Sequence, residues 1–326
     1  MINLFHIPHC KIDTSCLGHM LHGPIVQNFE EEFAAYVGAK YACSLHSASM
    51  AIFLTFMGPW AEGINIVKIP SVIPYVVPNV LANSHTAFTF NDNICWVGRS
   101  YVLHKFNFYD NMEESFKVID SAQQVDYQQF KIQANPKDLI IFSFYPTKPI
   151  GGVDGGMVVS DDKDKIDWFR QASMYGASQN KKTWDSWSKE LEFPGWKLYM
   201  NSLQAYVASQ NLFLLDAKKE RLTEIREYYN KKLGYNNMSH HLYRISIDSQ
   251  KHIQENFIEE MKDFGIQCGV HYHPCHLMDV YQPYVNNKIK FPLSEKEGKT
   301  TISIPFHEKL TQEEIRYIAE KINETI

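Results

Sequence analysis

The most informative stretch of this sequence is residues 142–156, which read FSFYPTKPIGGVDGG. An apolar run ends here, and Lys148 follows it just before two pairs of glycines. Tight turns can present such a lysine side chain to a cleft. The glycines match neither a dinucleotide-binding fingerprint nor a phosphate loop of the Gly-Lys-Ser/Thr type, so no nucleotide motif explains this lysine. The ordinary alternative is a solvated loop lysine, since lysine is usually exposed.

Short apolar runs around this stretch predict a buried sheet. The expected strands are residues 66–70, 117–120, 139–145 and 157–160. A helix is expected earlier, over residues 26–37, because apolar side chains recur there at helical spacing and Gly38 can serve as the C-cap. Strands that alternate with helices favour an α/β fold.

The pattern changes beyond about residue 206. A long helix is expected through Ala217, Arg221 and Tyr229, followed by a strand near 242–247 and by helices near 252–264 and 311–322. A chain of 326 residues is long for one compact core. We therefore expect a large domain over residues 1–205 and a smaller C-terminal α/β domain over residues 206–326.

The composition excludes several classes of protein. Apolar residues make up 44% and charged residues 21% of the chain, as in ordinary globular proteins and unlike disordered ones. Lys and Arg number 32 against 37 for Asp and Glu, so the formal charge is -5 and no basic excess is available for a polyanion. We expect no nucleic-acid partner.

Nothing in the sequence predicts secretion or membrane insertion. The first residues lack a basic segment followed by a long apolar one, and no run approaches the length of a membrane span. The six cysteines are scattered without a repeated C-x-x-C spacing, which favours reduced thiols. We expect a cytoplasmic protein without a membrane partner.

Two further segments contain residues suited to a cofactor. The run 117–120 ends in Asp120, and ligands of open α/β sheets gather at the carboxyl ends of strands. A carboxylate there can keep a pyridine nitrogen protonated, because an opposite charge favours the charged form; the alternative is a helix cap. Ser47-Ala48-Ser49 precedes an apolar helix whose free N–H groups could bind phosphate, although serine is also a common N-cap.

Several segments match one known family in the same order along the chain. In the first half they are Gly23-Pro24, Phe29-Glu30, Ser47-Ala48-Ser49, Asp120-Ser121-Ala122-Gln123 and the run from Phe142 to Lys148. In the second half they are Leu203-Gln204-Ala205, Gln210, Phe264-Gly265-Ile266, His271-Tyr272, His276 and Ile304-Pro305. The chain thereby resembles the DegT/StrS-type nucleotide-sugar aminotransferases, which are fold-type-I enzymes that use pyridoxal 5′-phosphate (PLP). The resemblance implies a large domain with a mostly parallel sheet and a smaller α/β lobe.

The resemblance also implies a role for each matching residue. Lys148 would form the Schiff base with PLP, and Asp120 would contact the pyridine nitrogen. Gln123 would lie near the ring hydroxyl of the cofactor. The phosphate would be held by backbone N–H and hydroxyl groups of Ala48, Ser49 and Ser143.

One segment predicts that two subunits share each site. The family's Gly-x-Asn-x-Arg-Met reads Gly195-Trp196-Lys197-Leu198-Tyr199-Met200 here. In the family the asparagine reaches the cofactor phosphate of the other subunit, so the resemblance implies a homodimer in which Lys197 makes this contact. A solvated lysine is the alternative, because the arginine position, now Tyr199, has also changed.

Two regions depart from the family pattern or invite another interpretation. The segment before Asp120 is short, and Pro74 stands where an aromatic residue usually stacks on the cofactor ring. His271, His273, Cys275 and His276 could be zinc ligands, since imidazole and thiolate bind zinc well. The family carries a similar run at the mouth of its site without a required metal. We therefore expect no metal, and substrate contacts from Tyr199, His271 and His276.

The resulting hypothesis is an aminotransferase that moves an amino group from an amino acid, L-glutamate by resemblance, to a nucleotide-linked keto sugar. Lys148 would move the proton in each half-reaction. A PLP-dependent sugar dehydratase on the same fold is the nearest alternative, but such family members tend to have histidine at the lysine position. The other alternative is a PLP-binding regulator or scaffold without catalysis.

Overall fold

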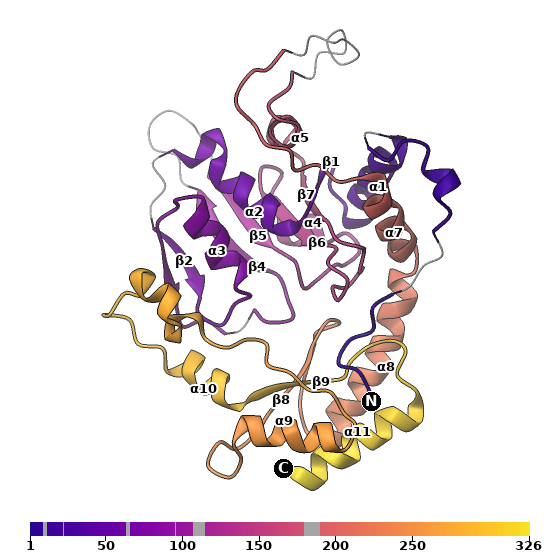
Figure 1. The fold of residues 1–326 in the computed structure, drawn as a ribbon, viewed down its shortest axis with the longest axis vertical. Helices are drawn as coiled ribbons and strands as arrows, with labels where there is room; N and C mark the ends of the chain where they lie inside the picture. The colour runs from indigo at the N-terminus through magenta and orange to yellow at the C-terminus, as the bar shows by residue number, and fades with distance from the viewer. Residues whose placement is uncertain (9–11, 22, 63–65, 95, 107–114, 179–189) are drawn as a thin grey trace.

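The chain folds into two lobes, each with hydrophobic clusters of its own. The computed structural model describes residues 1–8, 12–21, 23–62, 66–94, 96–106, 115–178 and 190–326. We call the part that contains the largest sheet the large lobe, and the part around the strands β8 (Tyr243–Ser246) and β9 (Thr301–Ile304), drawn below it in Figure 1, the small lobe.

A five-stranded sheet in the order β1-β7-β6-β5-β4 forms the centre of the large lobe. Its strands are β1 (Tyr41–Leu45), β4 (Tyr101–Phe106), β5 (Phe116–Asp120), β6 (Leu139–Ser143) and β7 (Gly156–Ser160). Of its pairings only β5 with β6 is parallel among the described residues. The expected mostly parallel sheet is therefore mixed. One reason is that β7 follows β6 along the chain and pairs with it directly, and the connecting residues 144–155 contain no helix that would cross back over the sheet to give a parallel pair.

Helices cover both faces of this sheet. One face packs against α1 (Pro24–Val37), α4 (Gln129–Gln133) and α7 (Ser202–Phe213), and the other against α2 (Ala48–Met57), α3 (Val76–Asn83) and α5 (Lys163–Ser173). Along β6, Ile140 and Phe142 face the first set while Leu139 and Ile141 face the second, because successive side chains of a strand alternate. Both faces of β6 are therefore buried.

A parallel two-stranded sheet, β2 (Val67–Pro70) and β3 (Phe88–Asn91), lies next to β4 of the larger sheet. A segment that follows helix α9 (Gln254–Asp263) of the small lobe crosses to this edge, where Cys275 N donates to Ser71 O at 2.8 Å and Tyr284 stacks on Phe88. Short 3₁₀ helices are η1 (Thr14–Leu17), η2 (Pro59–Ala61), η3 (Cys275–Leu277) and η4 (Asp279–Tyr284).

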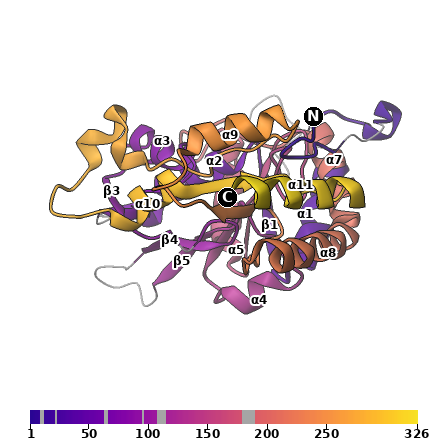
Figure 2. The same ribbon diagram turned by 90° about the horizontal axis from the view of Figure 1, so that it is seen from below.

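The small lobe packs helices around an antiparallel pair of strands, β8 (Tyr243–Ser246) and β9 (Thr301–Ile304). Its helices are α8 (Leu215–Leu233), α9 (Gln254–Asp263), α10 (Pro292–Thr300) and α11 (Gln312–Thr325). The amino terminus begins here, since Ile2 N donates to Gly265 O at 2.7 Å. Figures 1 and 2 accordingly show both chain ends on the same lobe.

The expected strands and helices are confirmed to within a few residues at their ends, and Gly38 caps α1 in the left-handed region with φ 81°. The division at residue 205 stays a prediction. α7 crosses it and packs in the large lobe through Ala205 and Ala208, while α8 contributes Leu215 to the large lobe and Leu222 to the small one.

Candidate active site

Asp120 is the last residue of β5, and its carboxylate is buried at the end of the sheet. It accepts hydrogen bonds from Ala122 N at 2.9 Å and from Tyr101 Oη at 3.0 Å. Burial raises the pKa of Asp120, while these two hydrogen bonds and the charge of Lys148 act in the opposite direction. The hydrogen bond from Ala122 N closes a local turn. Asp120 is therefore not a helix cap, because the N-cap of the next helix, α4, is Gln128.

Lys148 lies in the loop that joins β6 to β7. Hydrogen bonds across the loop hold it in place, with Lys148 N donating to Tyr145 O at 2.8 Å and Gly152 N donating to Phe144 O at 2.7 Å. Gly151 has φ 67°, a conformation that favours glycine. Burial lowers the pKa of Lys148 to about 8, although Asp120 raises it. The lysine and the carboxylate therefore interact electrostatically, and the amine is far less basic than a solvated lysine.

The first turn of α2 adjoins the end of β7. Ser47, rather than Ser49, is the N-cap, and its Oγ accepts from Met50 N at 3.3 Å. Gly156 pairs with Ser143 and lies so close to α2 that a Cβ on it would be 2.3 Å from Ala48 N. The expected phosphate donors of Ala48, Ser49 and Ser143 therefore lie around one glycine. N–H groups in a first helical turn have no intrahelical acceptor and can bind an anion.

Gln123 is buried and already has partners for both ends of its amide. Its Oε1 accepts from Gly98 N at 2.6 Å, and its Nε2 donates to Tyr272 Oη at 2.9 Å. The ring of Tyr272 is parallel to that of Trp96, with 6.3 Å between the centroids. The large lobe and the segment after α9 are thereby joined at Gln123.

Of the histidines expected to contact substrate, His271 lies near Lys148. Burial and then the charges of Lys148 and Arg244 lower the pKa of His271 to about 4, so its ring is neutral near pH 7. Its Nδ1 lies 2.9 Å from Ser303 Oγ. His271 is thus a neutral ring held beside a cation.

His276 occupies a different place, at the edge formed by β2. It is buried, its Nδ1 lies 2.6 Å from Ser71 Oγ, and its ring stacks on Phe291. Nothing links it to Lys148 among the described contacts, and its environment suits packing. No group of three potential metal ligands occurs in the described part of the chain.

Lys197 and Tyr199 lie on a segment that runs beside the end of β1. His46 N donates to Leu198 O at 2.6 Å, and Tyr199 bridges to Leu45. The Lys197 side chain is exposed, with its Nζ 5.9 Å from the centre of the Tyr199 ring. Tyr199 lines a surface groove that Glu30 and Arg170 also line, and that groove does not include Lys148. Within one chain, these two residues are not brought together with His271.

The residues present fit PLP. A lysine of reduced basicity faces a buried carboxylate, and a helix start beside Gly156 offers N–H groups for a phosphate dianion. Sequence reasoning missed Tyr101, Tyr272 and Gly98, which hold Asp120 and Gln123. Tyr272 had a signal, since it lies in the His271-Tyr272 match; Tyr101 and Gly98 had none, because they lie in the segment that departs from the family pattern.

Comparisons with known proteins point to one family. The sequence matches the DegT/DnrJ/EryC1/StrS aminotransferase family over residues 13–72 and 118–323. A spore coat polysaccharide biosynthesis protein of Bacillus subtilis is 27% identical over 95% of this chain and 91% of its own length. A UDP-4-amino-4,6-dideoxy-N-acetyl-beta-L-altrosamine transaminase of Campylobacter jejuni is 25% identical over 92% of this chain and 89% of its own.

Solved structures share the fold. The aminotransferase TlmJ of Streptoalloteichus hindustanus superposes with a TM-score of 0.76 at 18% identity, covering 99% of this chain and 98% of its own. Helicobacter pylori PseC, described as an aminotransferase involved in the biosynthesis of pseudoaminic acid, gives 0.75 at 18% identity and covers 99% of each chain. None of the helices in the described ranges is long and apolar enough to span a membrane.

The family match covers most of the chain, and its members are PLP-dependent aminotransferases. The expected cofactor and enzyme class are confirmed at this level. The chain belongs to the DegT/DnrJ/EryC1/StrS aminotransferase family.

Proposed function

We propose that this enzyme transfers an amino group from L-glutamate to the carbonyl carbon of a nucleotide-linked keto sugar. The observation that carries the proposal is Lys148, a partly buried amine of lowered pKa that interacts with the buried carboxylate of Asp120. The name of the Campylobacter jejuni relative, which acts on a UDP-linked amino sugar, supports the nucleotide-linked substrate.

Each residue has a definite task in this proposal. Bound PLP supplies an electron sink for the bond that breaks at the donor carbon. Lys148 Nζ would hold the cofactor, and it would then move a proton from the donor carbon to the C4′ carbon of the cofactor. A pKa of about 8 allows the amine to accept and donate this proton near neutral pH. Asp120 keeps the pyridine nitrogen protonated through its negative charge. His271, neutral at this pH, can donate or accept a hydrogen bond without adding a second cation.

Each site in this proposal is completed by a second subunit. Lys197 is exposed beside the end of β1, as a residue that contacts a partner must be. A lysine suits a phosphate dianion, because charge-assisted hydrogen bonds are roughly twice as strong as neutral ones. We therefore assign Lys197 and Tyr199 to the site of the partner subunit.

Incubation of the purified protein with PLP and L-glutamate tests the reaction. The cofactor spectrum should change to that of the amine form, with 2-oxoglutarate released in equal amount. Borohydride reduction and peptide mapping should place the pyridoxyl group on Lys148. Exposed Lys131 offers the matched control, since Lys131→Ala should leave both results unchanged and Lys148→Ala should abolish both. Cofactor binding without amine formation would instead support a non-catalytic PLP-binding protein.

A screen of keto sugars identifies the acceptor. The protein converted to the amine form is offered nucleotide-linked keto sugars and the matching free sugars, and products are measured by mass. An amino sugar formed only from the linked substrates supports the proposal. Loss of water without gain of nitrogen would support a dehydratase.

A further inference from the structure

A second cavity lies beneath α8, between the two lobes. Its volume is about 440 Å³, and its lining includes Arg99, Gln124, Pro149, Lys218, Lys219 and His240. Cavities of this size at a junction of lobes are typical places for small-molecule sites, and this one has a lining in which charged and polar side chains outnumber apolar ones. Of the residues proposed to hold PLP, only Gln123 borders it.

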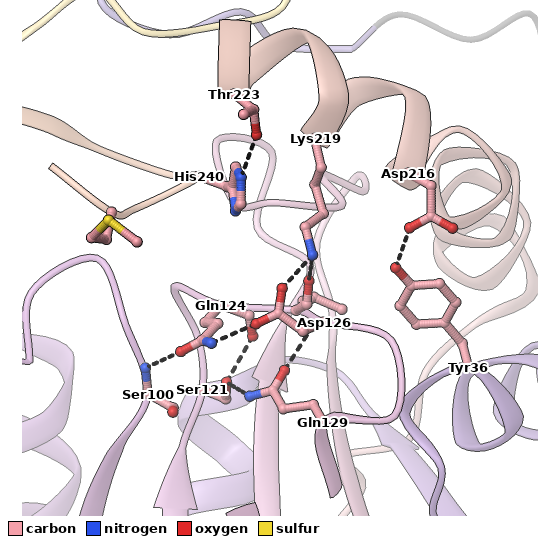
Figure 3. Close-up of polar contacts among 12 residues, drawn as sticks. Tyr36, Ser100, Ser121, Gln124, Asp126, Gln129, Asp216, Lys219, Thr223 and His240 are labelled. Atoms are coloured by element: carbon pink, nitrogen blue, oxygen red, sulfur yellow. Dashed lines mark hydrogen bonds and ion pairs between the residues drawn. The ribbon is translucent and has the colours of Figure 1, made fainter. Parts of the chain in front are cut away.

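The floor of the cavity is a fixed polar network, shown in Figure 3. Ser100 N donates to Gln124 Oε1 at 2.8 Å, and the Gln124 amide donates to Asp126. Asp126 in turn binds Lys219, which descends from α8. Because Asp126 is paired in this way, it cannot neutralise the other cations of the cavity.

Two further cations border the cavity, Lys218 and Arg99. Lys218 Nζ donates to Pro149 O at 2.8 Å; burial lowers the pKa of Lys218, and the charge of Glu308, which is not part of this lining, acts in the opposite direction. The Arg99 side chain is exposed at the rim and makes no hydrogen bond or ion pair with any residue that the structure describes. Among the residues that the structure describes, the lining contains three cations, Arg99, Lys218 and Lys219, against one carboxylate, Asp126, so it carries more positive than negative charge.

His240 adds a directed donor. Its Nε2 lies 3.1 Å from Arg226 Nη1 and 2.9 Å from Thr223 Oγ1. A guanidinium can only donate, so Nε2 accepts and the proton of the neutral ring is on Nδ1. Figure 3 shows this second ring nitrogen directed to the side on which Gln124 lies. Burial lowers the pKa of His240 to about 4, so the ring stays neutral near pH 7.

Apolar side chains form another part of the lining. Val125 and Leu215 belong to a hydrophobic cluster of the large lobe, Leu222 belongs to the cluster of the small lobe, and Met238 is exposed. We propose that this cavity binds a small organic anion, a carboxylate or phosphate group on an apolar body. Arg99 and Lys218 supply the opposite charge, His240 Nδ1 donates a hydrogen bond, and the apolar side chains cover the body. Such a ligand would join α8 to the loop that follows β5.

Binding of benzoate and phenyl phosphate to the PLP-loaded protein tests this proposal, with benzamide as the uncharged control. PLP fills its own phosphate site, so calorimetry reports the new one. At least one anion should bind and raise the melting temperature, since a ligand of the folded state stabilises it. Benzamide should bind at least about tenfold more weakly, as expected when a charge-assisted hydrogen bond is lost. The tighter anion identifies the charged group.

Variants locate the site. Arg99→Gln should weaken the anion about tenfold or more. Met238→Glu, at an exposed side chain that tolerates change, should weaken it by repulsion, whereas Arg316→Gln on the exposed face of α11 should have no effect. Failure of both anions to bind, or binding unchanged in both lining variants, would overturn the proposal. Anion binding that depends on Arg99 would support the cavity site even if PLP were found on a lysine other than Lys148. The proposal of an anion site and the proposed aminotransferase function can therefore be refuted independently.

Discussion

Tyr101→Phe removes one hydroxyl from the candidate site and leaves the ring in place. The hydroxyl donates to Asp120 Oδ2 at 3.0 Å; Asp120 is buried and Tyr101 is partly buried. A hydrogen bond to a charged group contributes about 1.5–3 kcal/mol, and a buried carboxylate that loses one cannot recover it from water. We expect the free energy of unfolding of the PLP-free protein to fall by about this amount where Asp120 is charged.

The effect should depend on pH in a definite direction. Tyr101 stabilises the charged form of Asp120, so the variant should have a still higher Asp120 pKa in the folded state. The loss of stability is therefore fully present above this pKa and shrinks as the pH falls through it. Urea unfolding of both proteins over a pH series measures this difference.

A double-mutant cycle with Asp120→Asn isolates the interaction. In the Asp120→Asn background, Tyr101→Phe should lower the free energy of unfolding clearly less, because the carboxylate charge is absent. Tyr127→Phe, at a tyrosine that is 64% exposed, serves as the control and should cost nothing measurable. An equal cost of Tyr101→Phe in both backgrounds would refute the role of Tyr101 in holding the charge of Asp120.

Four further outcomes are expected. Asp120→Asn should still bind PLP but slow the glutamate half-reaction by orders of magnitude, each tenfold equal to about 1.4 kcal/mol of barrier; near-normal single-turnover rates would contradict the assigned role. PLP capture by Lys148 should quicken as the pH rises through about 8, since the neutral amine is the nucleophile; a flat stopped-flow profile would argue against it. Gly156→Ala should lower the free energy of unfolding by about 1–3 kcal/mol and weaken PLP binding, because the added Cβ would clash with Ala48 N. An unchanged PLP affinity would contradict the placement of the phosphate site at Ala48. Mixed subunits carrying Lys148→Ala and Lys197→Ala should regain activity that neither homodimer has, because one site then contains both lysines; demonstrated heterodimers without activity would exclude the shared site.

The sequence predicted the elements whose hydrophobic pattern is local. β5 and β6 are short apolar runs that end at Asp120 and shortly before Lys148, and their burial on both faces is readable from composition alone. Strand direction was not readable in this way. β4 and β7 have the composition of any buried or half-buried strand, and only their pairing partners make the sheet mixed.

The contacts of a side chain could be predicted from the sequence only where the residue belongs to a recognisable motif. Ser47 and Ser49 both suit an N-cap, and the backbone, with Ser47 extended at φ -159°, selects Ser47. His276 matches the family motif, yet its ring packs between Ser71 and Phe291, which are distant in sequence. No local pattern encodes such a contact.

The segment 73–117 lies outside the family match, yet it contacts Asp120 and Gln123, two residues proposed to hold the cofactor. It contains β4, which pairs antiparallel with β5 and places Tyr101 opposite Asp120, and Gly98, whose N–H binds Gln123. Arg99 lies between these residues and borders the cavity beneath α8. The same short segment therefore links the support of Asp120 to the proposed anion site, so a ligand bound at Arg99 adjoins the loop that holds Gln123.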